Sequence, residues 1–316
     1  MDIQAPTRQD ILNAATRIAG KVHRTPVMSS ENLNELLGCR MFFKCENLQK
    51  AGAFKSRGAV NTVFSLRDDE IKNGVATHSS GNHAAALARA ARLRNIDAHI
   101  VMPVNSSKVK VAAVKNYGGK ITFCEANLTS RESTLLSVVE ECGAMEIHPY
   151  NDLRIIAGQA TAALELIEDT GHLDMILAPV GGGGLMSGTA LSAHYFSGKT
   201  RVIAAEPERA DDAFRSFRAG EFIPSLNPDT IADGLRTSLG SYTFPIIREY
   251  VHDIVTVSET AIVKAMKLTW ERMKIIIEPS SAVPLAAIME KKINTKGKNI
   301  GIIISGGNVD LDNLPW

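Results

Sequence analysis

The sequence predicts an α/β fold in which mainly parallel, helix-covered open sheets are divided between a large and a small domain. Apolar strands alternate with amphipathic helices along nearly the whole chain, which is the pattern of parallel sheets covered by helices. Glycine-rich turns follow several strands and open helices. Four short strand–helix units between about residues 74 and 149 can form a separate lobe. We therefore expect a large domain from residues 1–73 and 150–316, and a small domain from residues 74–149.

Strands are expected where short apolar runs end at glycine, proline or polar residues. They are residues 41–45, 75–78, 98–102, 120–124, 144–147, 174–180, 201–205 and 300–304. Helices are expected where apolar residues recur with helical spacing, and several of these segments end at a glycine. They are residues 7–19, 31–37, 55–66, 82–94, 108–116, 130–141, 154–168, 185–196, 259–273 and 281–290. The segment 219–245 is richer in Pro and Gly, and we expect it to be irregular.

Size and composition exclude several functional classes. The 316 residues suffice for a proper core, and a net charge of +1 gives no attraction to nucleic acids or acidic membranes. The sequence has no apolar signal region and no apolar run of membrane-spanning length. The four cysteines are scattered without a CxxC pair, so we expect reduced, buried thiols. These features favour a cytoplasmic protein that acts on a small molecule.

The segment 47–59, Asn-Leu-Gln-Lys-Ala-Gly-Ala-Phe-Lys-Ser-Arg-Gly-Ala, is the centre of the predicted site. Gly52 and Gly58 flank Lys55, and glycines allow a tight turn and a close approach to a ligand. Lys55 lies at the start of a predicted helix, where the helix dipole and a partly desolvated pocket disfavour its ammonium form. A lysine with a lowered pKa can act as a nucleophile or form a Schiff base. The alternative is a solvated loop lysine.

The run Gly181–Gly184 follows an apolar strand and opens a helix. Such a turn presents several backbone N–H groups at a helix N-terminus, which makes it an anion cradle suited to phosphate. A flexible linker is one alternative. A dinucleotide site is another, because Glu206 ends the next strand as in a Rossmann unit. However, Met186 and Ser187 stand where the third glycine of that motif belongs.

A second predicted anion site is Ser-Ser-Gly-Asn-His at residues 79–83, which also follows a strand and opens a helix. Its hydroxyls, amide and backbone N–H groups suit a carboxylate. Two anion cradles in one chain fit a phosphorylated cofactor and a carboxylated substrate. The alternatives are that Ser79 and Ser80 are helix caps and that His83 is a structural histidine.

Polar side chains follow two other strands. Ser305 precedes two glycines at the end of the last strand, where ligands of open α/β sheets bind; a tight turn is the alternative. Glu206, Asp211 and Asp212 cluster after the strand 201–205. Carboxylates with a nearby carbonyl suit Mg²⁺ or Ca²⁺, whereas an acidic cluster can equally be a solvated surface.

Four motifs in one order resemble the fold-type II pyridoxal-phosphate enzymes, which share the tryptophan synthase β-like fold. The similarity is to the serine racemase and serine/threonine dehydratase group, and it extends over the whole chain. The motifs are Ala-Phe-Lys-Ser-Arg-Gly at 53–58, Ser-Ser-Gly-Asn-His at 79–83, the four glycines at 181–184 and Ser-Gly-Gly-Asn at 305–308. The stretches 278–284 and 308–316 also look like those of bacterial 3-hydroxyaspartate dehydratases.

The resemblance implies a pyridoxal 5'-phosphate-dependent dehydratase, or ammonia-lyase, that removes water and ammonia from a β-hydroxy amino acid to give a 2-keto acid. L-Serine, L-threonine and 3-hydroxyaspartate are the candidate substrates, and serine racemisation is either an accompanying or the main activity. It also implies a homodimer whose small domain closes over the substrate. An NAD-dependent oxidoreductase that uses Gly181–Gly184, and a non-catalytic binding protein, are the alternatives from other classes.

The resemblance also implies a role for each site residue. Lys55 would hold the cofactor covalently and move protons at Cα, with Phe54 packed against the ring. Gly181, Gly182, Gly183 and Gly184 would bind the phosphate, Asn82 would reach the phenolic oxygen and Ser305 the pyridine nitrogen. The substrate carboxylate would be bound by Ser79, Ser80, Asn82 and His83, with Ser80 on the face opposite Lys55. A divalent cation (Mg²⁺, Ca²⁺ or Mn²⁺) would be held by Glu206, Asp212 and the carbonyl of Ala210.

A neutral serine at the pyridine nitrogen leaves that nitrogen largely unprotonated, which favours loss of a β-hydroxyl over transamination. Ala84–Ala86 and Tyr150 differ from the animal racemases that the chain resembles, which also favours dehydration over racemisation. Glu31 lies where those racemases use their nucleotide effector. Recognition of the β-carboxylate of 3-hydroxyaspartate requires a cation, and three arginines are candidates: Arg131, Arg154 and Arg236.

Overall fold

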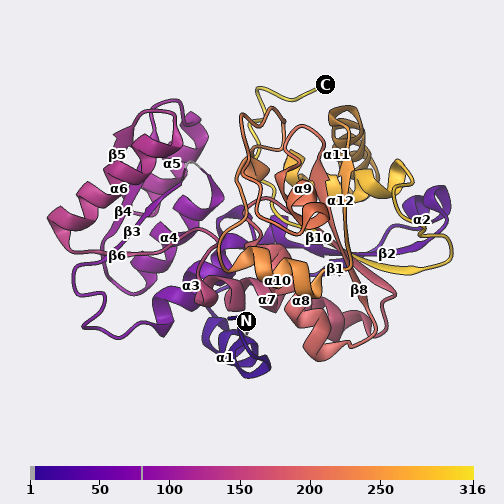
Figure 1. Ribbon diagram of the computed structural model, residues 1–316, viewed down its shortest axis with the longest axis horizontal. Helices are drawn as coiled ribbons and strands as arrows, with labels where there is room; N and C mark the ends of the chain where they lie inside the picture. Colours follow the sequence, from indigo (N-terminus) through magenta and orange to yellow (C-terminus); the bar gives the residue numbers. More distant parts are fainter. Residues whose placement is uncertain (1–3, 80) are drawn as a thin grey trace.

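The computed structural model describes residues 4–79 and 81–316, and its strands form two separate sheets (Figure 1). The strands are β1 (Val27–Met28), β2 (Arg40–Cys45), β3 (Val75–His78), β4 (Ala98–Pro103), β5 (Lys120–Cys124), β6 (Met145–Glu146), β7 (Met175–Pro179), β8 (Arg201–Pro207), β9 (Asp253–Val257) and β10 (Asn299–Ile304). One sheet has the order β1-β2-β10-β7-β8-β9 and the other β5-β4-β3-β6. In the described part of the chain, every strand pair except β1–β2 is parallel. The mainly parallel α/β class is confirmed.

Twelve α-helices and three short 3₁₀-helices are found among the described residues. The α-helices are α1 (Arg8–Ile18), α2 (Glu31–Leu37), α3 (Lys55–Ser65), α4 (Asn82–Leu93), α5 (Lys108–Asn116), α6 (Leu128–Cys142), α7 (Leu153–Thr170), α8 (Gly184–Phe196), α9 (Asp212–Ala219), α10 (Thr243–Tyr250), α11 (Glu259–Met273) and α12 (Pro279–Met289). The 3₁₀-helices are η1 (Glu46–Leu48), η2 (Lys50–Gly52) and η3 (Asp233–Leu235). None of the described helices combines the length and apolar character needed to cross a membrane.

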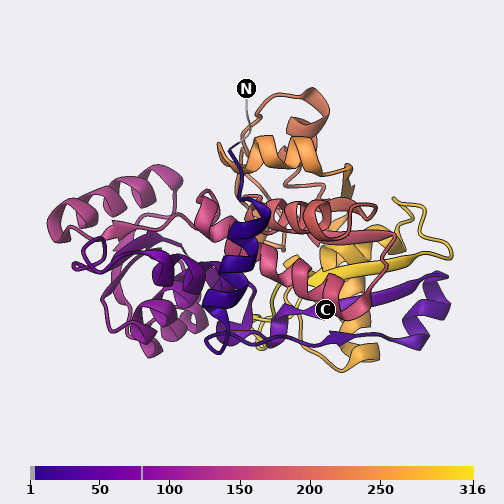
Figure 2. The ribbon, with the colours of Figure 1, turned by 90° about the horizontal axis from the view of Figure 1, so that it is seen from below.

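The four-stranded sheet and helices α4–α6 form what we call the small lobe, and the six-stranded sheet with its helices forms the large lobe (Figure 1). Helix α3 packs against α4 on one side and α7 on the other. A Cβ at Gly58 would lie 2.5 Å from the Gln159 side chain, so this glycine serves close packing of α3 on α7. Figure 2 shows α1 crossing the junction of the lobes, where it contacts α3 and α7. The exact domain boundaries stay a prediction.

The central strands of the large sheet are buried on both faces, which explains their uninterrupted apolar sequences. Leu177 of β7 belongs to a core cluster that includes α12, whereas its neighbour Ile176 belongs to a second cluster that includes α7 and α8. Ile302 and Ile303 of β10 divide between the same two clusters. Because these strands are parallel, their carboxyl ends lie at the same edge of the sheet, where ligand sites of open α/β folds form.

The structure also corrects parts of the prediction. Strands β1 and β9 and helices α9 and α10 were not expected, and α10 begins inside the segment that we expected to be irregular. Pro245 lies in the first turn of α10, where a proline costs no helical hydrogen bond. All four cysteines are free, as expected, but Cys142 is only partly buried.

Candidate active site

Lys55 is the first residue of α3, and the turn before it lies against the loop after β10. Ala51 and Gly52 both have positive φ angles, of 54° and 70°. A Cβ at Gly52 would lie 2.3 Å from the side-chain oxygen of Asn308, so a glycine is required there. The backbone N–H of Phe54 donates to the carbonyl of Ser305 at 3.0 Å. These contacts fix the start of α3, and with it Lys55, beside the carboxyl end of β10.

The amine of Lys55 lies in a largely desolvated environment. Its Nζ donates to the carbonyl of Pro149 at 2.8 Å and lies 5.2 Å from the centre of the Phe54 ring. Burial lowers the pKa of Lys55 to about 8, although the nearby Glu278 carboxylate opposes the shift. The predicted decrease in pKa is confirmed, and the solvated-lysine alternative is wrong. A lysine in this state is partly neutral near physiological pH and can act as a nucleophile.

The glycine run forms a buried turn at the N-terminus of α8. Gly183 has a φ of 89° and is the N-cap of the helix. A Cβ at Gly182 would lie 2.3 Å from the ring of Tyr150, and one at Gly181 would lie 2.8 Å from the backbone of Leu235. The hydroxyl of Thr243 donates to the carbonyl of Gly182 at 2.9 Å. The turn is packed and helix-capping, so the flexible-linker alternative is wrong, and its geometry suits a phosphate.

Ser305 follows β10 and is 3% exposed. Its hydroxyl lies 3.0 Å from the hydroxyl of Ser281 on α12. The hydroxyl of Ser281 donates to the carbonyl of Gly306 at 2.7 Å, and it also accepts from the Gly306 N–H at 2.8 Å. The two serines thus form a neutral hydroxyl pair, and no carboxylate of the described residues hydrogen-bonds to either hydroxyl. Such a pair can donate a hydrogen bond to an unprotonated ring nitrogen.

The segment after β3 brings the second predicted anion site to the same region. Gly81 is the N-cap of α4, and its N–H donates to the hydroxyl of Ser79 at 3.3 Å, so Ser79 is not the cap residue. His83 is 2% exposed, and burial lowers its pKa well below the usual range. Asn82 begins α4 and reaches across to the large lobe. Ser80 lies outside the described residues, so its predicted role stays a prediction.

A group of aromatic and histidine rings adjoins the glycine turn. The rings of His148 and Tyr150 lie 4.6 Å apart edge to face, and those of His78 and His148 lie 6.3 Å apart. Burial lowers the pKa of both histidines to about 4, so both are neutral near pH 7. The Nδ1 atom of His148 accepts from the N–H of Asn151 at 2.9 Å. Its other nitrogen therefore carries the proton and can donate.

The structure distinguishes the three candidate arginines. Arg154 is paired with Asp152 at 2.6 Å. Both Nε and Nη2 of Arg236 donate to the carbonyl of Thr230. By contrast, the Nε of Arg131 is buried with no hydrogen-bond partner in the described part of the chain. The Arg131 charge also contributes to the lowered pKa of His78, so this arginine lies within electrostatic reach of the histidine group.

The predicted metal ligands are buried. Glu206 and Asp212 are both 0% exposed, so the solvated-surface alternative is wrong for them. It holds for Asp211, which pairs with Arg215 at the surface. Glu206 accepts from two N–H groups of the first turn of α9, at 3.0 and 2.8 Å. Within residues 4–79 and 81–316 neither buried side-chain oxygen of Asp212 has a hydrogen-bond partner of good geometry, although the Ser225 hydroxyl lies near enough to lower the pKa of this carboxyl.

The acidic pair needs a partner for physical reasons. Burial raises the pKa of Asp212 to about 6 and that of Glu206 well above its usual range. Neighbouring negative charges raise both further: Asp211 acts on both carboxyls, and Asp212 also acts on Glu206. Two adjacent buried carboxylates are costly without a cation. In the described residues no group of three or more His, Cys, Asp or Glu side chains could hold a metal. Two carboxylates alone are too few ligands for a metal ion, so one at this place would also need the Ala210 carbonyl and waters, a set of oxygen ligands of the kind that suits Mg²⁺.

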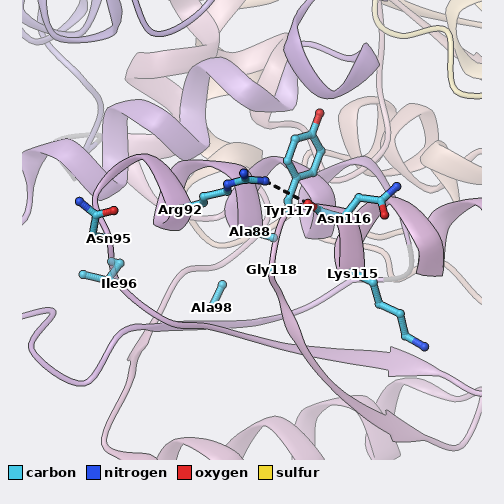
Figure 3. Close-up of a pocket in the computed structure, with 9 residues that line it drawn as sticks. All are labelled: Ala88, Arg92, Asn95, Ile96, Ala98, Lys115, Asn116, Tyr117 and Gly118. Atoms are coloured by element: carbon cyan, nitrogen blue, oxygen red, sulfur yellow. Dashed lines mark hydrogen bonds between the residues drawn. The ribbon is translucent and has the colours of Figure 1, made fainter.

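A separate hollow of about 330 Å³ lies on the small lobe (Figure 3). Its lining comes mainly from the C-terminal ends of α4 and α5, and Arg92 donates to the carbonyl of Asn116 there at 3.1 Å. It includes none of the predicted site residues. The hollow is therefore distinct from the candidate active site.

Several site residues escaped the sequence prediction. Glu278 was noted only as part of a closing motif, although it is buried between Asn82 and Lys55. Its position before Pro279 is typical of a helix start, so the local sequence gives a structural reason for Glu278 and no sign of its contact with the site. Ser281 and His148 likewise depend on contacts between segments far apart in sequence, which local patterns do not show.

The chain belongs to the pyridoxal-phosphate dependent enzymes, because the model of that family matches residues 18–306. Within that family it has the fold-type II architecture. It is 52% identical to a beta-hydroxyaspartate dehydratase of Paracoccus denitrificans, over 98% of this chain and 99% of the relative. It is 46% identical to the L-threo-3-hydroxyaspartate ammonia-lyase of Saccharomyces cerevisiae, over 97% and 94% of the two chains. The structure of maize serine racemase matches with a TM-score of 0.95 at 49% identity, over 98% and 95% of the two chains.

These similarities decide between the enzyme classes. A family assignment that includes Lys55, the glycine turn and Ser305 within its matched range supports pyridoxal phosphate as the phosphorylated ligand. The dinucleotide alternative rested on an incomplete motif, and the family assignment replaces it. The resemblance inferred from the four motifs is confirmed.

Proposed function

We propose that this protein is a pyridoxal-phosphate-dependent dehydratase, an ammonia-lyase, whose preferred substrate is 3-hydroxyaspartate. The observation that carries the proposal is the largely buried Lys55, with its pKa lowered to about 8, beside a glycine turn and a neutral serine pair. Relatives that are named for 3-hydroxyaspartate chemistry support the substrate class. L-Serine and L-threonine would be slower substrates that share the α-carbon chemistry.

The residues present fit the cofactor. Gly181–Gly184 would hold its phosphate at the positive end of α8, where a Cβ at Gly182 would strike Tyr150. Lys55 would hold it covalently, with Phe54 against the ring. Ser305 would donate to the ring nitrogen and Asn82 to the phenolic oxygen. When bound, the cofactor supplies an electron sink that acidifies the Cα–H bond of the substrate.

The chain's own residues would then direct the reaction. Lys55, as a neutral amine, would take the Cα proton from one face of the substrate. The N-terminus of α4 would orient the substrate carboxylate, with contacts from Ser79, Ser80, Asn82 and His83. The β-hydroxyl would leave as water with the proton that Lys55 has taken up, and addition of water to the dehydrated product would release a 2-keto acid and ammonia. The neutral Ser305 disfavours a long-lived charge on the ring, and so favours this elimination over transamination.

Arg131 would recognise the β-carboxylate of 3-hydroxyaspartate. It is the candidate arginine with a buried, unpartnered nitrogen, while the neighbouring histidines are neutral. An arginine binds a carboxylate through two parallel hydrogen bonds, which a lysine cannot reproduce. Arg131→Lys should therefore lower kcat/KM for 3-hydroxyaspartate by about 100-fold, as for loss of a buried charge pair. The loss on L-serine should be much smaller, and Arg154→Lys is the matched control. Equal losses on both substrates would reject this role.

A divalent cation at Glu206, Asp212 and the Ala210 carbonyl is part of the proposal. The buried, unpartnered oxygens of Asp212 support it. The Asp212 charge also raises the pKa of Tyr150, after the larger effect of burial, so the acidic pair lies within electrostatic reach of the ring on the glycine turn. A cation there would neutralise the pair and order the turn that binds phosphate.

The test is an activity screen of purified protein loaded with pyridoxal phosphate. Keto acid and ammonia are measured from L-threo- and erythro-3-hydroxyaspartate, L-serine and L-threonine, and the enantiomer ratio of serine is followed in parallel. We expect release from 3-hydroxyaspartate to be fastest. A protein that binds the cofactor but releases no keto acid from any of these substrates would refute the dehydratase proposal.

Serine racemase is the second candidate, because the fold matches maize serine racemase so closely. Racemisation needs an acid-base group on each face of Cα, because one face loses the proton and the other receives it, and Ser80 would serve the face opposite Lys55. Ser80→Ala should then abolish formation of D-serine while it spares most dehydration. Racemisation at the wild-type rate in that variant would contradict the assignment. We further propose that the protein is a homodimer, which sedimentation of the purified protein would test. We also propose that it is cytoplasmic.

A further inference from the structure

Glu278 is a buried carboxylate that the reaction outlined above leaves without a role. It is the N-cap residue of α12, but its side chain makes no capping hydrogen bond. It is 4% exposed, and it belongs to the large lobe. A buried carboxylate is costly unless specific donors surround it, so its partners indicate what it does.

The partner of Glu278 is Asn82, the first residue of α4 in the small lobe. The amide nitrogen of Asn82 lies 3.0 Å from each carboxylate oxygen of Glu278. The two oxygens of one carboxylate lie too close together to be reached by both N–H bonds of an amide, because those bonds diverge widely. One N–H of Asn82 is therefore shared between the two oxygens, and the other remains available to a different acceptor.

The orientation of the Asn82 amide is fixed from its other end as well. The amide nitrogen of Asn308 donates to the side-chain oxygen of Asn82 at 2.9 Å, and to the carbonyl of Ala51 at 2.8 Å. Because Asn308 is held by the turn before Lys55, it can present only a donor to Asn82. The carboxylate of Glu278, in its ionised form, accepts only. Together they permit a single orientation of the Asn82 amide, with its nitrogen toward Glu278.

Glu278 also lies within electrostatic reach of the reactive amine. Its charge raises the pKa of Lys55 against the larger effect of burial. Burial raises the pKa of Glu278 itself to about 7, and the Asn82 hydrogen bond opposes that shift. Lys110 of α5 and Asp233 of η3 also face it, and these two residues form an ion pair between the lobes. The carboxylate thus occupies the point where the small lobe meets the large one.

We propose that Glu278 is a positioning residue that acts through Asn82: it holds one N–H of Asn82 so that the other points to the phenolic oxygen of the cofactor. The inference rests on the proposed function for the identity of the cofactor. The same hydrogen bond joins the N-terminus of α4 to the large lobe, so it couples the position of the substrate-binding helix to the cofactor.

Glu278→Gln tests the proposal with little change in shape. A glutamine places an NH₂ group where one carboxylate oxygen now accepts, so a donor would face the Asn82 nitrogen and the amide would lose its single orientation. The matched control is Glu290→Gln at the opposite end of α12, where the carboxylate accepts from the hydroxyl of Ser258 at 2.6 Å. Both variants remove one carboxylate from the same helix.

The first measurement is the dissociation constant of pyridoxal phosphate for the apoenzyme, by fluorescence quenching. The second is the ratio of the two absorption bands that report protonation of the phenolic oxygen. We expect Glu278→Gln to weaken cofactor binding by about tenfold, the effect of one lost charge-assisted hydrogen bond, and to change the band ratio. Glu290→Gln should change neither. Neither measurement involves substrate, so a failed dehydratase proposal would leave this test intact.

A double variant shows whether Glu278 acts through Asn82. If it does, Asn82→Ala/Glu278→Gln should bind the cofactor no more weakly than Asn82→Ala alone. Losses that multiply in the double variant would overturn the proposal, and so would wild-type binding and band ratio in Glu278→Gln. If Glu278→Gln does not fold, Glu278→Asp, which retracts the carboxylate by one methylene, is held to the same criterion.

Discussion

Arg57 provides the sharpest test of how the reactive lysine is held. It lies two residues after Lys55 on α3 and is fully buried. Its guanidinium binds Glu46 at 2.7 and 2.8 Å and Glu165 at 2.7 and 2.8 Å. Lys44 adds a further contact to Glu165 at 2.7 Å. The group contains two cations and two carboxylates, so its net charge is zero.

Arg57→Met keeps an unbranched side chain of similar length but replaces the charged guanidinium by an apolar group, so one carboxylate is left uncompensated. Glu46 is 0% exposed and would retain only neutral donors, such as the hydroxyl of Thr25 at 2.5 Å. Breaking a buried ion pair in this way costs about 3–5 kcal/mol. The entropy of unfolding of a 316-residue chain is about 0.7 kcal/mol per degree, so the melting temperature should fall by about 4–7 °C.

The assay is thermal unfolding of the holoenzyme, followed by circular dichroism and by the visible absorption of the cofactor. Two further variants give the reasoning its controls. Arg67→Met removes an exposed ion pair with Asp69 and should leave the melting temperature almost unchanged. Arg57→Met/Glu46→Gln removes both charges of the pair and should recover most of the loss, since a neutral replacement of a buried pair is tolerated. A single variant as stable as wild type, or a double variant less stable than Arg57→Met, would refute the account.

Three other predictions follow from the site. The rate at which the apoenzyme captures pyridoxal phosphate should rise as the pH passes through about 8, because burial lowers the pKa of Lys55 to that value and only the neutral amine attacks an aldehyde; a rate that does not change between about pH 6 and 10 would contradict this. Gly182→Ala should weaken cofactor binding by more than about tenfold, since the added Cβ would lie 2.3 Å from the Tyr150 ring, and equilibrium dialysis of the folded variant would show it. Removal of divalent cations should lower the melting temperature of wild type, because an ion bound only to the native state stabilises it by mass action, whereas Asp212→Asn should show no response; equal responses would leave Asp212 without a metal.

The fold and part of the site could be predicted because their signals are local. Strand and helix periods depend on neighbouring residues, and the prediction located every strand of the large sheet except its two edge strands, β1 and β9. Lys55 and the glycine turn at 181–184 were found because glycines at a strand end limit what the backbone can do. The metal ligands Glu206 and Asp212 were located as a cluster, but their complete burial could not be read from a sequence in which Asp211 looks the same.

The remaining site residues could not be predicted because their roles arise only when distant segments meet. Glu278 acquires its place from Asn82, 196 positions earlier, and from Asn308. The choice of Arg131 over two other arginines depends on which of them lacks a partner after folding. The two short elements β1 and α9 were missed for a related reason, since contacts with the large sheet stabilise them more than their own sequence does.

The charges around Lys55 favour one class of substrate. The neighbouring rings are neutral at physiological pH because burial lowers the pKa values of His78, His83 and His148. The expected partner of the ring nitrogen is a hydroxyl pair with no charge. The carboxylate of Glu278 is directed to Asn82, so Arg131 is the remaining cation with unused hydrogen-bonding capacity among the candidate arginines. A substrate with a single carboxylate would use the N-terminus of α4 and leave the buried Nε of the partly buried Arg131 without a hydrogen-bond partner, which is unfavourable. A second carboxylate on the substrate removes that cost, and this is the physical reason to expect 3-hydroxyaspartate to be preferred over serine and threonine.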